Sequence, residues 1–152
     1  MLIKLESSFV ADFKMLTLAE LKIAYNMGIV SIDAFINKAM ANTELGNYSE
    51  DELELSALSS QNTFCILEKV DKIIIAKTSE QESDCDKLMC ICLYWVYKNK
   101  DTIENLNTII DAIVSDFGYP DFARELTVGY FGGGEHLKEF LNGCKFSYIF
   151  NL

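Results

Sequence analysis

The segment 84–100 constrains the fold more than any other part of the sequence. It combines an apolar stripe at helical spacing with further apolar and aromatic side chains on the remaining faces. A helix that is apolar nearly all round is usually buried in a globular core. Its uncharged run, residues 88–97, is far shorter than the roughly 20 residues that span a bilayer. The stripe itself comprises Cys85, Leu88, Met89, Cys92, Leu93 and Val96.

We therefore predict an all-α fold, a single domain over residues 1–152 in which six or seven helices surround this central helix. Four sequences have the pattern of a capping box, in which paired side chains satisfy free backbone N–H groups where a helix begins. The pairs are Thr17–Glu20, Ser49–Glu52, Ser79–Glu82 and Asp101–Glu104. Glycines at positions 28, 118 and 143 are placed to end helices. The predicted helices cover residues 17–27, 31–44, 49–58, 64–74, 79–100, 101–117 and 135–141.

Two segments also fit a β-strand. The β-branched run 73–75 leaves a strand open there. At the end of the chain, Phe146, Tyr148 and Phe150 alternate with other residues, which is typical of a strand that could pair with residues 2–5. We expect this aromatic tail to pack back on the helices. The alternative is an exposed edge that adds to a partner's sheet.

Acidic residues dominate the charge and are unevenly spread. The chain has 23 acidic and 13 basic residues, a net charge of −10. Segments 39–68, 78–86 and 101–123 carry acids and neither Lys nor Arg. Helix dipoles account for part of this excess, because acids favour first helical turns. The remainder predicts a face for a basic protein, and neither nucleic acid nor an anionic membrane as partner. The predicted partner-binding residues are Glu50, Asp51, Glu52, Glu54, Glu80, Glu82, Asp84, Asp86 and Asp116.

No motif for catalysis, cofactor binding or metal binding is present, so we predict no catalytic, cofactor-binding or metal-binding residue. The cysteines at 85, 90 and 92 lack the C-x-x-C spacing of zinc and redox sites, and we read them as small buried hydrophobes. His136 is the only histidine and has no nucleophile motif beside it. Glycines 132–134 lack the Lys-Ser/Thr of a P-loop.

An enzyme is the weaker alternative. It rests only on pairs of carboxylates, such as Glu50 with Glu54 or Asp84 with Asp86, which can bind a metal or exchange protons. The expected location is the cytoplasm. The first residues lack the apolar run of a signal peptide, and the five cysteines are an odd number that suits free thiols.

Three segments together resemble a bacterial family, the domain of unknown function 2247. They are the helix–Gly–x–x–Ser segment 21–31, the aromatic segment 93–97, and the segment 113–120 with its acid–aromatic–x–Tyr–Pro motif. The resemblance covers about residues 15–125, and the chain departs from the family pattern beyond Arg124. It implies a helical protein without established activity, and some members of the family are similar to immunity proteins.

Charge and resemblance lead to one functional hypothesis. We expect a cytoplasmic immunity protein that binds and neutralises a cognate basic toxin domain without catalysis. Many secreted bacterial toxin domains are basic nucleases, whose substrate an acidic inhibitor can mimic. A helical scaffold or regulatory binding module is the alternative with the same fold.

Overall fold

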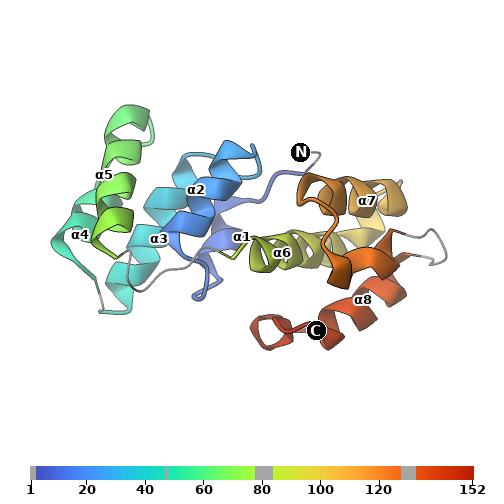
Figure 1. The fold of residues 1–152 in the computed structure, drawn as a ribbon. Coiled ribbons are helices and arrows are strands. Elements are labelled where there is room, and N and C mark those ends of the chain that lie inside the picture. The colour runs from blue at the N-terminus through green and yellow to red at the C-terminus, as the bar shows by residue number, and fades with distance from the viewer. Residues whose placement is uncertain (1–2, 47, 78–83, 128–132) are drawn as a thin grey trace. The chain divides into compact units, whose positions relative to one another are not determined.

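The computed structural model describes residues 3–46, 48–77, 84–127 and 133–152, and all the regular structure in these ranges is helical (Figure 1). The all-α class is thus confirmed. Contacts divide the chain into an N-terminal unit, Lys4–Ser83, and a C-terminal unit, Asp84–Leu152 together with the first three residues. A single domain and a bundle around one central helix stay predictions, because this division rests on contacts and not on independent folding.

The N-terminal unit contains helices α1 to α5. Their bounds are α1 Ser7–Ala11, α2 Leu18–Asn26, α3 Asp33–Glu44, α4 Glu50–Ser56 and α5 Thr63–Ala76. Helix α3 packs against α1, α2, α4 and α5, and α5 also contacts α2 and α4. Leu21, Phe35, Leu55, Ile66 and Val70 are fully buried, one or more from each of α2 to α5, and they form the core of this unit.

Local capping signals explain where α2 begins and ends. Thr17 and Glu20 form the predicted capping box, with each side chain bonded to the other's backbone N–H. Gly28 adopts a positive φ of 76° and the N–H of Ile29 donates to the carbonyl of Ala24, which is a Schellman ending. Ser31 was expected to cap α3, but this helix begins after Ile32 without a side-chain cap.

The C-terminal unit contains α6 Cys85–Lys98, α7 Leu106–Asp116 and α8 Gly133–Gly143. The 3₁₀ helices η1 Lys100–Thr102, η2 Asp121–Leu126 and η3 Ser147–Ile149 lie in its connections and tail. Helix α6 packs against both α7 and α8. Its residues from Lys87 to Tyr94 are all buried, as is Val96. The predicted apolar helix therefore forms the core of this unit.

Several predicted boundaries were wrong. Asp101 and Glu104 do not form a capping box, because α7 begins only at Leu106, after Asn105. Residues 73–75 continue α5, so the alternative of a strand there is wrong. Helix α1 was not predicted, since five residues show too little periodicity. The capping pair Ser79–Glu82 lies outside the described residues, and Asp84 caps α6 instead.

The aromatic tail packs back on its own unit, but not as a strand. Residues Ser147–Ile149 form η3, and Phe146 is buried. Phe150 stacks on Tyr94 of α6 with 4.8 Å between ring centroids, and the Tyr94 hydroxyl donates to the carbonyl of Asn151 at 3.3 Å. Tyr148 points into solvent, with 67% of its surface exposed. The expected packing is confirmed and the expected strand is wrong.

Candidate protein-binding surface

The short helix α4 places acidic and apolar side chains together on its exposed side. Glu50, Leu53 and Glu54 are spaced i, i+3 and i+4, so they share one face of the helix. Leu53 is 48% exposed, and the Glu54 side chain is 51% exposed. The segment leading into α4 is exposed as well. We call the exposed residues of this region the α4 surface: Glu44, Leu45, Tyr48, Glu50, Leu53 and Glu54.

The opposite side of α4 packs into the unit and carries another acid of the predicted site, Glu52. Glu52 is fully buried and pairs with Lys77, the residue after α5. Its carboxylate thus lies inside the unit, and its role as a partner-binding residue stays a prediction. Leu55, three residues further, is also fully buried and faces the same interior.

Lys69 of α5 forms ion pairs with two more of the predicted acids. Its ammonium lies 2.5 Å from a carboxylate oxygen of Glu54 and 3.2 Å from one of Asp51. The hydrogen bonds to Glu54 and then Asp51 raise the pKa of Lys69 above its ordinary value. Glu50 forms no ion pair or hydrogen bond with another residue in the part of the chain that is described. Among the predicted acids of the α4 surface, Glu50 is thus the one most available to a partner.

Backbone capping sets the orientation of these side chains. The hydroxyl of Ser49 accepts a hydrogen bond from the N–H of Glu52 at 3.2 Å, which fixes the first turn of α4. In the predicted capping box the Glu52 side chain would also accept a hydrogen bond from the N–H of Ser49. It pairs with Lys77 instead. Three acids in the first turn also favour the helix through its dipole.

The predicted acids of the C-terminal unit have separate structural settings. Asp84 caps α6, accepting hydrogen bonds from the N–H groups of Asp86 and Lys87 at 3.0 and 3.2 Å. Asp86 is half-buried in the first turn, and Asp116 is exposed in the last turn of α7. Glu80 and Glu82 lie outside the described residues. Because α4 belongs to the other unit, a surface shared by all nine acids stays a prediction.

Sequence reasoning missed the apolar part of the α4 surface. Leu45, Tyr48 and Leu53 are 58%, 46% and 48% exposed. The signal for Leu53 was available: Leu53 and Leu55 are two positions apart in a helix, roughly 200° around its axis, so only one can face the core. No local signal marks Leu45 or Tyr48.

Three features of the described residues bear on the alternative of an enzyme. No group of three or more His, Cys, Asp or Glu side chains is placed to hold a metal ion in the ranges described. Of the three cysteines predicted as small buried hydrophobes, Cys90 and Cys92 are buried, whereas Cys85 is exposed and its prediction is wrong. Desolvation raises the pKa of the Cys90 and Cys92 thiols, that of Cys92 to about 12. They stay protonated at neutral pH, and thiols in this form are poor nucleophiles. His136 pairs loosely with Glu139 at 3.8 Å.

Comparison with known proteins places the chain in a family without defining its activity. No helix in the described ranges has the length and apolar character to cross a membrane. No curated protein and no solved structure matches the chain. A sequence model described as "Uncharacterized protein conserved in bacteria" matches residues 7–131, a wider range than the expected 15–125. This match covers helices α1 to α7 and η2, and the chain therefore belongs to the bacterial family DUF2247.

Proposed function

We propose that this protein is a cytoplasmic immunity protein that binds and neutralises a cognate basic toxin domain without catalysis. The observation that carries the proposal is the α4 surface, where exposed acidic and apolar side chains lie together. The acids suit a basic partner, and the apolar side chains suit a protein. A single domain with α6 as its central helix stays part of the proposal.

The composition of the α4 surface fits a protein interface better than a solvated helix face. Interfaces combine an apolar or aromatic centre with a polar rim. Tyr48 and Leu53 would supply the centre, and Glu44, Glu50 and Glu54 would supply the rim. Single exposed apolar residues are ordinary on protein surfaces, so the argument rests on three of them within nine positions of the sequence.

Charge supports the same kind of partner. The net charge of −10 attracts basic proteins over a range set by ionic strength. Such steering raises association rates by about 10–10³-fold and weakens as salt is added. Of the predicted acids Glu50 and Glu54, Glu50 has the larger expected local contribution, because Glu54 shares its charge with Lys69.

The test is a binding measurement with the toxin domain encoded immediately upstream. We expect Glu50→Lys with Leu53→Ala to weaken binding by at least about tenfold, through lost pairing and lost apolar contact. Asp111→Lys together with Leu152→Ala is the matched control. It makes the same change of net charge and also truncates an exposed leucine, but it alters exposed positions of the C-terminal unit.

Three results would contradict the proposal. The first is an upstream toxin that does not bind. The second is equal binding by the α4 variant and the control. The third is a complex formed only with a protein encoded elsewhere, which would favour the alternative of a helical scaffold or regulatory module. An ion bound tightly by the carboxylates, together with turnover of a substrate, would favour an enzyme.

A further inference from the structure

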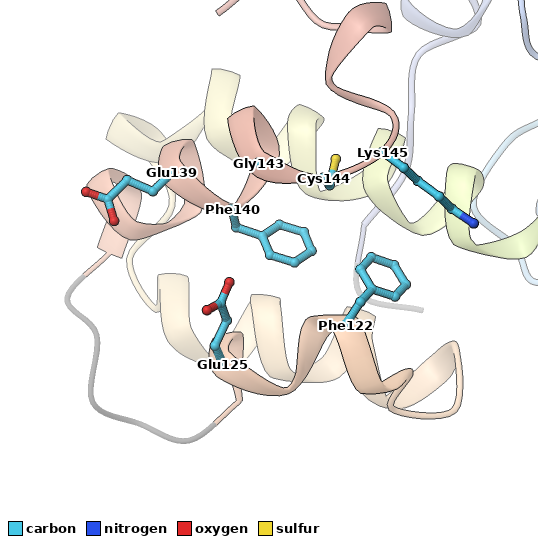
Figure 2. A pocket seen from close by; sticks show the side chains of 7 residues that line it. All are labelled: Phe122, Glu125, Glu139, Phe140, Gly143, Cys144 and Lys145. Carbon is cyan, nitrogen blue, oxygen red and sulfur yellow. The ribbon is translucent and has the colours of Figure 1, made fainter.

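The C-terminal unit contains a pocket between η2 and α8 (Figure 2). Its volume is about 380 Å³, within the range of about 300–1,000 Å³ that is usual for ligand sites. We call it the Phe122 pocket. It is lined by Phe122 and Glu125 from η2, by Glu139, Phe140 and Gly143 from α8, and by Cys144 and Lys145.

Two aromatic rings form its apolar part. Phe122 and Phe140 have ring centroids 5.9 Å apart and planes inclined by 15°, and Figure 2 shows both rings turned into the space between η2 and α8. Phe140 is only 6% exposed, whereas Phe122 is 38% exposed. Phe140 therefore belongs to the core, and Phe122 offers an aromatic surface to an occupant.

The charged groups are separated along the pocket. The carboxylates of Glu125 and Glu139 lie at one end in Figure 2, with Glu125 directed toward Phe140, and Lys145 lies at the other end. The ammonium of Lys145 is placed over the Phe146 ring, 4.9 Å from its centroid. Glu139 is 80% exposed at the rim and pairs with His136. Glu125 has no ion pair with any residue in the described ranges.

We propose that the Phe122 pocket binds an arginine side chain of the basic protein partner. This inference rests on the proposed function and adds a second contact site to it. A guanidinium group is planar, stacks on aromatic faces and pairs with carboxylates, so it matches both the rings and Glu125. A phosphate group would be repelled by the two carboxylates, and an apolar side chain would offer the exposed Glu125 carboxylate no partner.

The arginine has to come from another molecule. The chain contains a single arginine, Arg124, and its guanidinium is paired with Asp121 at 3.0 Å in the same 3₁₀ helix. Lysine is a poorer occupant, because its ammonium is a compact, strongly hydrated charge that does not stack in a plane.

The experiment uses a small probe, so it does not require the toxin. Nα-acetyl-arginine amide is titrated into ¹⁵N-labelled full-length protein, with Nα-acetyl-citrulline amide as the uncharged, nearly isosteric control. We expect saturable shifts at residues 122–126 and 139–145 with arginine, and binding at least about threefold weaker with citrulline. Equal binding of the two probes, or shifts that lie elsewhere, would overturn the inference.

Variants locate the interaction. Glu125→Gln and Phe122→Ala should each weaken arginine binding about three- to tenfold, whereas Asp111→Asn on α7 should leave it unchanged. Because Phe122 is partly exposed, its truncation should cost less stability than truncation of buried Phe140. The dispersion of the ¹⁵N spectrum shows whether each variant is folded. A folded Glu125→Gln protein that binds arginine as well as the natural chain would also overturn the inference.

The two proposals fail separately. If arginine binds at the pocket but the toxin does not bind the protein, the proposed function is contradicted and the assignment of the Phe122 pocket as an arginine site stands. A toxin that binds through the α4 surface, with no arginine binding at the pocket, would contradict only the inference.

Discussion

The two units of the chain use different interactions to hold their helices together. In the N-terminal unit, ion pairs join separate helices: Lys22 of α2 pairs with Asp71 of α5, and Lys69 and Lys77 connect α5 and its end to α4. In the C-terminal unit, α6 is buried along most of its length by apolar side chains. Two ion pairs in the described part of this unit, Arg124–Asp121 and His136–Glu139, each join residues only three positions apart.

Charged groups also enter the interior of the N-terminal unit, where Glu20, Lys38 and Glu52 are buried, whereas Lys87 is the one buried charged residue among the described residues of the C-terminal unit. Lys38 is 3% exposed, and its ammonium donates to the carbonyl of Phe13 at 2.8 Å and to that of Lys14 at 3.4 Å. Buried charges are costly to leave unpaired, and exposed ion pairs weaken in salt. The comparison predicts that salt and charge substitutions act mainly on the N-terminal unit, and loss of apolar volume mainly on the C-terminal unit.

The largest effect is expected for Leu93→Ala in α6. Leu93 is fully buried, so the substitution leaves a cavity and should lower the free energy of unfolding by about 2–5 kcal/mol. Leu53→Ala is the matched control, because Leu53 is half-exposed and its truncation should change stability by less than about 0.5 kcal/mol. Denaturant titration measures both. A loss below about 1 kcal/mol for Leu93→Ala would contradict the role of α6 as core. Trp95 was expected to be buried like Leu93, but it is only half-buried and is the weaker test.

Deletion of residues 145–152 tests the apolar character of the C-terminal unit at its edge. The deletion removes buried Phe146 and the stack of Phe150 on Tyr94. We expect the free energy of unfolding to fall by about 2–4 kcal/mol, since burying an aromatic side chain stabilises by about 1.5–3 kcal/mol. Thermal unfolding followed by circular dichroism measures the loss, with Tyr148→Ala as the exposed control. An unchanged melting temperature would instead support a tail that serves a partner.

Lys38→Met tests the buried charge of the N-terminal unit. Methionine keeps the length of the side chain but leaves the buried carbonyl of Phe13 without this donor, which should cost about 1–3 kcal/mol. Lys72→Met on the exposed side of α5 should change stability by less than about 0.5 kcal/mol. Equal effects of the two substitutions in denaturant titrations would show that the interior charge has no special role.

Lys69→Met should produce the smallest change in stability. This change can be recognised by its dependence on pH. The pKa of Lys69 is raised in the folded protein, so the ammonium stabilises the fold below its unfolded pKa of about 10.4. This contribution is lost as the pH rises through the higher folded pKa. We therefore expect the difference in melting temperature between the natural protein and the variant to be constant from about pH 7 to 9 and to shrink above about pH 10.4. Added salt should reduce the same difference, because the Glu54 and Asp51 side chains that pair with Lys69 are 51% and 42% exposed to solvent. A difference that grows at alkaline pH would contradict the pairing.

Thiol labelling can follow the two units separately. Cys65 of α5 is exposed, whereas Cys90 and Cys92 of α6 are buried. Reaction of Cys92 with a thiol reagent therefore reports opening of the C-terminal unit, and the variants above show whether destabilising one unit opens the other.

The sequence predicted those parts of the fold that depend on neighbours along the chain. The helix class, the capping box of Thr17 with Glu20, and the endings at Gly28 and Gly118 follow from local backbone hydrogen bonds. The buried stripe of α6 follows from helical spacing. In contrast, the alternation of Phe146, Tyr148 and Phe150 was compatible with a strand, and contact with Tyr94, more than fifty residues earlier, accompanies a 3₁₀ turn instead.

The candidate site shows the same limit. Sequence alone determined that four of the five residues 50–54 are acidic and that this segment begins a helix, because composition and capping are local properties. Only the tertiary structure decided that Glu52 is buried against Lys77, that Glu54 is shared with Lys69, and that Glu50 faces solvent. All three are glutamates within one helical turn and a half, so local chemistry cannot distinguish them. The distinction arises from which side of α4 packs against α5, and that packing brings in lysines 15 to 25 residues away.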